Sequence, residues 1–281
     1  MTGPADRLGR ADLHVHTLAS DGTHAVTEIL AHVARNELLD VIAISDHDRI
    51  DAALAARHMA EDRGYPFEVV VAEEVSTRGG HLLALWIERP LPPFKSLRWT
   101  IEAIHDQGGL AVPAHPITPF IMCAQPGDLR RLLLDDNVAV HPDALETFNP
   151  TELGKYRHDA VIRFADEHGL AHLGNSDSHV KTAVARGWTT FPGHTAADLR
   201  AAIAARTTES HGHFHGPFDE LGIYGRQLRK YARGWQATVG GRVRGDGTGR
   251  DLGYPGGRQR PATFDRELAR SLHAQGREHD R

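Results

Sequence analysis

The sequence is poor in cysteine, in basic charge and in long apolar runs. Its 281 residues include one cysteine, Cys123, which cannot form an internal disulfide and suits a reducing compartment. Lysine and arginine number 32 against 37 acidic residues, and the net charge of -5 excludes a general nucleic-acid coat protein, which needs a basic excess. No apolar run approaches the roughly 20 residues that span a bilayer, and the first ten residues do not resemble a signal peptide. We therefore expect a cytoplasmic protein without a membrane partner.

Histidine, by contrast, is abundant, with 20 residues in the chain. Because a single thiol cannot build a metal site, any bound ion would be held by imidazole nitrogens and carboxylate oxygens. Hydrophobic residues make up 40% and charged residues 25% of the chain, which is ordinary for a globular protein. The length is sufficient for one large α/β domain.

Between residues 12 and 192, short β-rich runs alternate with amphipathic helical stretches. The expected strands are 13–16, 41–44, 67–71, 81–87, 110–114, 144–148 and 170–174. The expected helices are 26–38, a run of alanines and arginines ending near 63, 97–106, 129–134 and 153–168. Strand alternating with helix is the pattern of a parallel sheet, and seven strands in this length favour a closed or nearly closed barrel.

The C-terminal part of the chain differs in composition. One amphipathic helix is expected at 221–235, and the sequence beyond it is rich in Gly, Arg and Asp, with little that forms a core. We therefore expect a catalytic domain at 11–215 and a C-terminal extension at 216–281, with one helix and then largely disordered chain.

Two histidines near the N-terminus alternate with apolar residues. His14 and His16 flank Val15 in a predicted strand, so both side chains project from the same face. A His-x-His pair on one face is a chelate for Zn²⁺, Mn²⁺ or Fe²⁺. Asp21 follows in a turn, where it is either a further ligand or the cap of the helix that begins near residue 26.

Other ionisable residues fall at or near the ends of most of the remaining strands. They are Asp46, His47 and Asp48 after the second strand, Glu73 and Glu74 at the third, His81 at the fourth, His115 after the fifth, and Asp177 and His179 after the seventh. Ionisable groups directly after a buried strand are costly unless they serve a purpose. Because the carboxyl ends of the strands build the active site of an α/β barrel, we predict one polar site at this rim.

Together these residues form motifs that resemble the PHP (polymerase and histidinol phosphatase) family. The motifs are Asp-Leu-His-Val-His-Thr at 12–17, Ser-Asp-His at 45–47, Glu-Val-Ser-Thr at 74–77, Ala-His-Pro at 114–116 and Ser-Asp-Ser-His at 176–179. They come in that family's order and cover about residues 11–190. The resemblance implies a distorted (β/α)7 barrel with a trinuclear metal site at the C-terminal ends of its strands.

The resemblance also implies a set of nine ligands. One ion would be held by His14, His16, Glu74 and Asp177, a second by Glu74, His81 and His115, and a third by Asp21, His47 and His179. Glu74 would bridge the first two ions, and it is preferred to Glu73 because it begins the Glu-Val-Ser-Thr motif. An aspartate at position 21 resembles the branch of the family that includes small-molecule and nucleotide phosphoesterases.

Three residues outside the ligand set are given roles as hypotheses. Asp46 is expected to orient His47 or another ligand from behind. Arg78 and Arg186 each follow a ligand segment and are candidates to bind the substrate phosphate.

Three further histidines alternate directly after the predicted barrel. His211, His213 and His215 either line the mouth of the site or lie in an exposed turn. Cys123 has no matched catalytic partner in the sequence and is interpreted as a small buried or half-buried residue.

The predicted reaction is hydrolysis of a phosphate ester of a small metabolite or nucleotide by a metal-bridging hydroxide, with two or three Mn²⁺, Zn²⁺ or Fe²⁺ ions as cofactors. The alternative is an exonuclease or phosphodiesterase for short or single-stranded nucleic acid, which would then be bound only as a substrate. A third interpretation is a metal-stabilised accessory domain without activity. The acidic balance and the lack of aromatic-plus-basic stretches favour the small substrate. The sequence leaves the oligomeric state and the choice of metal open.

Overall fold

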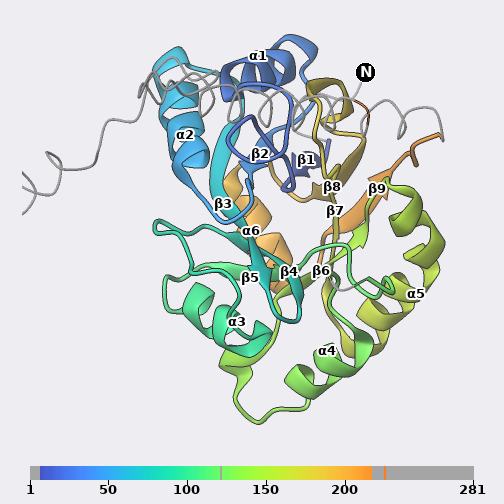
Figure 1. Ribbon diagram of the computed structural model, residues 1–281. Coiled ribbons are helices and arrows are strands. Elements are labelled where there is room, and N and C mark those ends of the chain that lie inside the picture. The colour runs from blue at the N-terminus through green and yellow to red at the C-terminus, as the bar shows by residue number, and fades with distance from the viewer. Residues whose placement is uncertain (1–6, 121, 217–224, 226–281) are drawn as a thin grey trace, which may run out of the picture. The chain divides into compact units, whose positions relative to one another are not determined.

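The computed structural model describes residues 7–120, 122–216 and 225 (Figure 1). The predicted helix at 221–235, apart from residue 225, and the rest of the C-terminal extension lie outside the described residues.

Nine strands form two sheets in the described chain. The larger sheet has the order β5-β4-β3-β2-β1-β8-β9, and β6 pairs with β7 in the smaller one. The strands are β1 (Gly9–Asp12), β2 (Val41–Ile44), β3 (Glu68–Thr77), β4 (Gly80–Leu85), β5 (Leu110–Pro113), β6 (Ala144–Phe148), β7 (Ala171–Gly174), β8 (Gly187–Phe191) and β9 (Glu209–Gly212).

The large sheet curls so that its two ends approach the β6–β7 pair. At one end, the Asp143 N–H donates to Ala111 O at 2.9 Å, while the Ala111 N–H donates to Asp143 Oδ2 at 2.7 Å. At the other end, the Thr189 hydroxyl accepts from the Gly174 N–H at 3.0 Å and lies 2.9 Å from the Gly174 carbonyl oxygen. These contacts join the two sheets into a curled, barrel-like arrangement without a continuous strand ladder.

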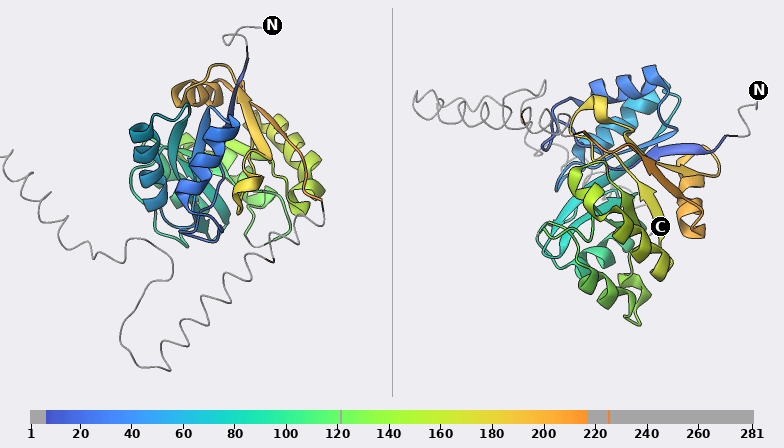
Figure 2. Two further views of the ribbon diagram at one scale, coloured as in Figure 1. Left: turned by 90° about the horizontal axis from the view of Figure 1, so that it is seen from above. Right: turned by 90° about the vertical axis from the view of Figure 1, so that its right-hand side faces the viewer.

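Helices lie around the outside of the strands (Figure 2). They are α1 (Val26–Asn36), α2 (Asp51–Arg63), α3 (Leu97–His105), α4 (Pro126–Leu133), α5 (Glu152–His168) and α6 (Ala196–Ala205), with 3-10 turns at Val138–Val140 and Lys181–Ala183. A core between sheet and helices includes Ile29 and Leu30 of α1, Ile42 of β2 and Ile101 of α3, all almost fully buried. None of the helices in the described ranges is long and apolar enough to cross a membrane.

The fold is α/β, as predicted, but the sheet is mixed. The first four residues of β3 pair with β2 in parallel, whereas Ala72 to Thr77 pair with β4 in the antiparallel sense. β4 and β5 are also antiparallel, as are β8 and its neighbours β1 and β9. The prediction of seven strands therefore missed β8 and β9, and it also missed α6. The tight Arg78-Gly79 turn leaves no room for a crossover helix between β3 and β4, which makes them a hairpin.

Sequence and structure also differ at the first strand. Hydrogen-bonded pairing begins at Gly9 and ends at Asp12, before the predicted segment 13–16. Beyond Asp12 the chain remains extended enough for Val15 to form an isolated parallel bridge with Ser178. His14 and His16 consequently lie past the end of β1, beside the loop that follows β7.

One pH-dependent contact secures the junction of β5 and β6. His105, at the end of α3, has Nδ1 2.7 Å from Ala139 O and Nε2 2.9 Å from Asp143 Oδ2. The hydrogen bond to Asp143 is the main cause that raises the pKa of His105. The protonated imidazole thus stabilises the fold, fully below the unfolded-state pKa of about 6.5, and the effect is lost as pH rises through the higher folded-state pKa.

We predict that His105→Gln lowers the free energy of unfolding by about 1 kcal/mol at pH 6 relative to the wild type. The difference should shrink towards pH 9, as the pH rises through the folded-state pKa of His105. Urea denaturation of both proteins at the two pH values measures it. A difference that does not change with pH would show that the charge of His105 contributes nothing.

Candidate metal centre

The nine predicted ligand side chains lie together at one end of the strands. Loops after β1, β2, β5 and β7 supply most of them. Glu74 lies within β3, and His81 near the start of β4 reaches the same end because the hairpin reverses the chain. Backbone bonds hold the loops after β1 and β7 together, from the His16 N–H to Ser178 O at 2.9 Å and from the Ser178 N–H to His14 O at 3.1 Å.

Glu74 lies at the middle of this cluster and is almost completely buried. Its Oε2 is 3.1 Å from His14 Nε2, 3.2 Å from His16 Nε2 and 3.2 Å from His47 Nδ1. Its Oε1 is 2.7 Å from His81 Nδ1 and 3.1 Å from His115 Nε2. Each carboxylate oxygen therefore faces a different group of imidazoles, which is the arrangement expected of a carboxylate that bridges two cations.

Two aspartates complete the cluster. Asp177 Oδ1 lies 3.4 Å from His14 Nε2 and 3.3 Å from His16 Nε2, on the ring atoms that also face Glu74. Asp21 Oδ2 lies 2.9 Å from His179 Nε2 and 3.8 Å from His47 Nε2. Asp21 is thus part of the cluster.

The donor atoms converge closely enough to surround metal ions. Four groups have ligand atoms within 4.8 Å of one another: His16, Asp21, His47 and His179; His14, His115 and Asp177; His14, His16 and Glu74; and His47, Glu74 and His81. His14 Nε2 and His16 Nε2 are buried beside the Glu74 and Asp177 carboxylates without a well-formed hydrogen bond, and His81 Nε2, the ring nitrogen that does not face Glu74, is buried without one as well. Unpartnered buried nitrogens are costly, and in a set of nitrogen and oxygen donors they fit divalent transition metals. The distribution of the nine side chains over individual ions stays a prediction. His47 belongs to the group of Glu74 and His81 as well as to that of Asp21 and His179, and His115 is grouped with His14 and Asp177 and not with Glu74 and His81.

The charges of the cluster favour a bound cation. Burial alone would raise the pKa of Glu74, but the surrounding imidazoles, His14 foremost, hold it well below its usual range. Burial would also raise the pKa of Asp177, but the imidazoles of His14 and His16 hold it well below its usual range. Burial would lower the pKa of His16, yet contacts with Asp177 and Glu74 raise it to about 10. Buried carboxylates thus demand positive charge beside them, which divalent ions provide.

The sequence analysis missed one residue that orients the ligands, Glu146 of β6. Its Oε1 lies 2.9 Å from His14 Nδ1, and its Oε2 accepts the His115 N–H at 2.7 Å. Asn149 and Asn175 donate to the same carboxylate at 3.1 and 3.0 Å. A carboxylate behind a ligand imidazole fixes the ring and its tautomer. The available signal was the position of Glu146 inside a buried strand, where an unpaired carboxylate is not tolerated.

Asp46 holds a loop and does not contact His47 through its side chain in the described contacts. Its Oδ1 accepts the Thr17 N–H at 2.8 Å and the Ser20 N–H at 3.2 Å, and its Oδ2 accepts the Thr17 hydroxyl at 2.7 Å. These bonds fix the segment between His16 and Asp21. The role predicted for Asp46 behind a metal ligand stays a prediction.

The two predicted phosphate-binding arginines lie in different surroundings. Arg186 donates from Nε to His213 O at 3.0 Å and from Nη2 to Phe214 O at 3.1 Å, which ties down the chain after β9. Arg78 lines a hollow of about 350 Å³ with Arg98 and Asp135. Contact of either arginine with a phosphate stays a prediction.

Of the three alternating histidines after the predicted barrel, His213 is exposed, whereas His211 and His215 are not in an exposed turn. His211 lies in β9, where its ring stacks on Trp188 and its Nε2 is 2.8 Å from the Thr190 hydroxyl. His215 is buried, and its N–H donates to Pro150 O at 2.8 Å. This segment therefore packs against the domain.

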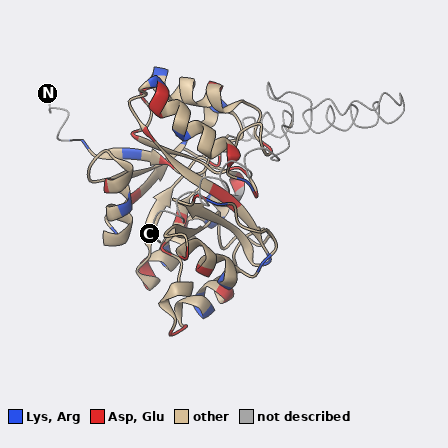
Figure 3. Ribbon diagram, turned by 90° about the vertical axis from the view of Figure 1, so that its left-hand side faces the viewer, with Lys and Arg blue, Asp and Glu red and all other residues tan. Residues whose placement is uncertain are grey.

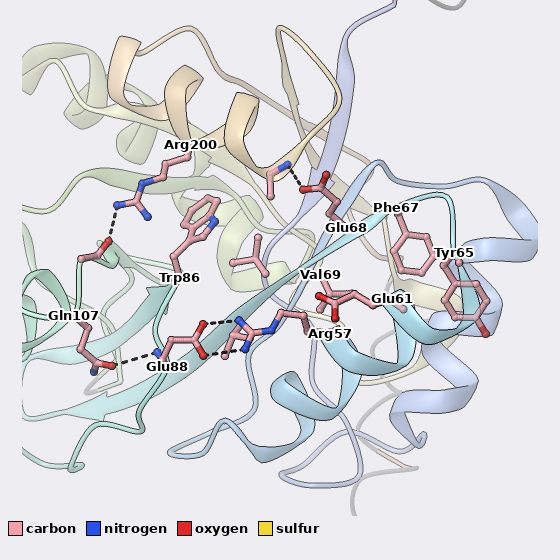
Figure 4. Close-up of a pocket in the computed structure, with 16 residues that line it drawn as sticks. Arg57, Glu61, Tyr65, Phe67, Glu68, Val69, Trp86, Glu88, Gln107 and Arg200 are labelled. Carbon is pink, nitrogen blue, oxygen red and sulfur yellow. Dashed lines mark hydrogen bonds and ion pairs between the residues drawn. The ribbon is translucent and has the colours of Figure 1, made fainter. Parts of the chain in front are cut away.

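The hollow of about 720 Å³ shown in Figure 4 lies elsewhere, between α2, α6 and the outer face of β3. None of the nine ligand side chains lines it. Several of its polar groups pair with one another, as in the Arg57 Nη2 to Glu88 Oε2 bond of 2.9 Å, and Arg200 lies over the Trp86 ring. We place the chemistry at the histidine cluster, where the buried charges and unpartnered nitrogens gather.

Comparisons with known proteins agree with this geometry. Residues 155–208 match the family model described as PHP-associated. The uncharacterized protein MJ1587 of Methanocaldococcus jannaschii is 32% identical over 164 residues, which span 54% of this chain and 86% of that protein. A two-domain protein of Bacteroides vulgatus that contains a predicted PHP-like metal-dependent phosphoesterase superposes with a TM-score of 0.62 at 18% identity, over 76% of this chain and 68% of that one. The chain belongs to the PHP family.

As a member of the PHP family, the protein is a hydrolase that acts on phosphoester bonds. A 5'-3' exoribonuclease of Haemophilus influenzae is also similar, with 31% identity over 105 residues. That match spans 36% of this PHP protein and only 37% of the exoribonuclease. A match over so small a part of both chains does not show which substrate this protein hydrolyses.

The adjacent glutamates of β3 allow a matched test of the centre. We predict that Glu74→Gln lowers the affinity for Mn²⁺ by more than the roughly 10–100-fold typical of a residue behind a ligand, because it removes the charge shared by five imidazoles. Glu73→Gln should leave the affinity unchanged. Burial raises the pKa of Glu73 to about 7, and its Oε2 only accepts the Leu91 N–H at 2.9 Å, which an amide oxygen can also do.

Equilibrium dialysis against Mn²⁺ followed by elemental analysis measures both variants. Equal losses of Mn²⁺ affinity in the two variants would mean that any change to a buried carboxylate of β3 disturbs the site. A loss of Mn²⁺ affinity in Glu73→Gln alone would mean that Glu73, and not Glu74, is the ligand.

Proposed function

We propose that this PHP protein hydrolyses a phosphate monoester or diester of a small metabolite or nucleotide at the histidine cluster, with two or three divalent ions held by the nine side chains. The observation that carries the proposal is the buried Glu74 carboxylate with imidazoles on both oxygens. When bound, such ions supply Lewis-acid chemistry, polarising the phosphoryl group and a water molecule. Mn²⁺, Zn²⁺ and Fe²⁺ all suit this donor set.

The residues of the chain keep the site in place for this chemistry. Glu146 contacts the ring of His14 and the backbone of His115, which links the segments that follow β1 and β5. Asn149 donates to Glu146 at 3.1 Å and to Asp177 at 3.2 Å, which links the carboxylate behind a ligand to a predicted ligand. Preorganised groups of this kind lower the reorganisation that accompanies reaction.

The backbone near two predicted ligands adopts a strained conformation. His115 and Asp177 have φ values of 32° and 48°, in the left-handed region that residues other than glycine seldom adopt. The bonds from the His115 N–H to Glu146 and from the Asn149 amide to Asp177 support these conformations. Strain that surrounding contacts maintain is typical of functional sites.

The charge of the described chain supports a small substrate. Acidic and basic side chains are interspersed along the ribbon in the view of Figure 3. A long nucleic acid would call for a basic track along its backbone. The second candidate, an exonuclease for short nucleic acids, is favoured by the partial similarity to the exoribonuclease.

We predict that His47→Ala and Asp177→Ala each lower kcat/KM for the best phosphate ester by about 10³-fold, equivalent to roughly 4 kcal/mol of transition-state stabilisation. The control is His58→Ala, because His58 is an exposed histidine of α2 outside the cluster. A screen with Mn²⁺ should compare an aryl phosphate, nucleoside monophosphates, a nucleoside bisphosphate and a short 5'-phosphorylated RNA.

Turnover of a small ester that both cluster variants lose would support the proposal. Turnover of the RNA alone would favour the exonuclease. Cluster variants that keep their activity while losing melting temperature would mean that the cluster is structural.

A further inference from the structure

Cys123, the single cysteine, contacts a predicted ligand. Its Sγ lies 3.4 Å from Nδ1 of His115, and its side chain is buried. The opposite ring nitrogen, His115 Nε2, lies 3.1 Å from Glu74 Oε1. The thiol therefore stands directly behind an imidazole whose other face points into the cluster.

Hydrogen bonds hold the described residues on either side of Cys123. The Ile117 N–H donates to Ala124 O at 2.8 Å, and the Gln125 amide donates to Thr118 O at 2.9 Å and to Cys123 O at 2.8 Å. At its far side the loop packs on the start of β4, where Gly80 has φ +115° and a side chain would collide with the backbone of Ala124. The thiol is therefore held in place by the backbone and by a glycine that permits close approach.

Other imidazoles of the cluster have stronger groups behind them. Nδ1 of His14 lies 2.9 Å from the Glu146 carboxylate, and Nδ1 of His179 lies 2.9 Å from the Asp177 carbonyl oxygen. A thiol is a weaker hydrogen-bonding partner than either, and unlike the Glu146 carboxylate it is neutral. On the same oxygen of Glu74, His81 has its far nitrogen buried without any partner. The imidazoles on Glu74 Oε1 are thus less firmly supported than His14.

We infer that Cys123 is a positioning residue for His115, and that the ion on the Oε1 side of Glu74 is the weakly held, exchangeable one. This inference rests on the proposed function, since it concerns one of its predicted ions. The hydrogen bond to the thiol orients the ring and leaves Nε2 as the donor to the ion. Because the thiol adds little charge to that bond, His115 is a weaker ligand than His14 with its carboxylate.

The test measures Mn²⁺ binding by equilibrium dialysis and elemental analysis for the wild type, Cys123→Ser, Cys123→Ala and Cys123→Val. The serine hydroxyl keeps a hydrogen-bonding group behind His115, whereas alanine removes it and valine removes it at nearly constant volume. We expect alanine and valine to weaken one Mn²⁺ equivalent, the last to fill, by about tenfold or more. Serine should stay close to the wild type, and the tighter equivalents should not change.

A second measurement separates positioning from folding. The half-saturating Mn²⁺ concentration for turnover should rise in Cys123→Ala, while kcat at saturating Mn²⁺ approaches the wild-type value. Melting temperatures of the metal-free proteins report on packing alone. The inference would be overturned if the melting temperature fell and all Mn²⁺ equivalents were weakened equally. It would also be overturned if Cys123→Ser and Cys123→Val bound Mn²⁺ with the same affinities.

These outcomes differ from failure of the proposed function. A wild type that binds Mn²⁺ and hydrolyses an ester, with Cys123 variants that bind equally well, would overturn the inference alone. A wild type that binds no Mn²⁺ would overturn both.

Discussion

The Glu74 carboxylate is buried inside the domain and contacts five imidazoles, three on one oxygen and two on the other. Removing one carboxylate and this many imidazoles from water is expensive, and a fold can retain them only if opposite charge is gathered around them. The remainder of the site follows from that requirement. Asp21 and Glu146 add carboxylates on the far sides of His16 and His14, and Asp177 lies beside Glu74 on the Nε2 atoms of the same two rings.

The mixed sheet is what makes this concentration of ligands feasible. Parallel strands β1, β2 and β3 direct the loops that follow them to one end, while the β3–β4 hairpin returns His81 to the same place without a crossover. The β6–β7 pair, tied in by Asp143 and Thr189, contributes Glu146 and the loop of Asp177. Strained backbone at His115 and Asp177 is tolerated because carboxylate and amide groups hold both segments.

Much of the site was accessible from the sequence, because ligands at strand ends leave a local pattern. His14 and His16 alternate with apolar residues, and Glu74 begins a recognisable motif. Glu146, Cys123 and the loop-holding role of Asp46 were not accessible, since each depends on which segments meet across the fold and not on spacing along the chain. The strands β8 and β9 were missed for a similar reason. The pairing of β8 with β1 joins residues about 180 positions apart, β9 pairs only with β8, and threonine, tryptophan and histidine give the two strands no clear apolar alternation.

The most direct test of the account is anomalous diffraction from crystals of the protein soaked in Mn²⁺. The account predicts two or three anomalous peaks, with at least one beside each carboxylate oxygen of Glu74 and with His14 and His16 sharing the peak on the Oε2 side. Peaks confined to surface histidines, or an empty centre with Glu74 still surrounded by its five imidazoles, would contradict a metal-dependent site at this position.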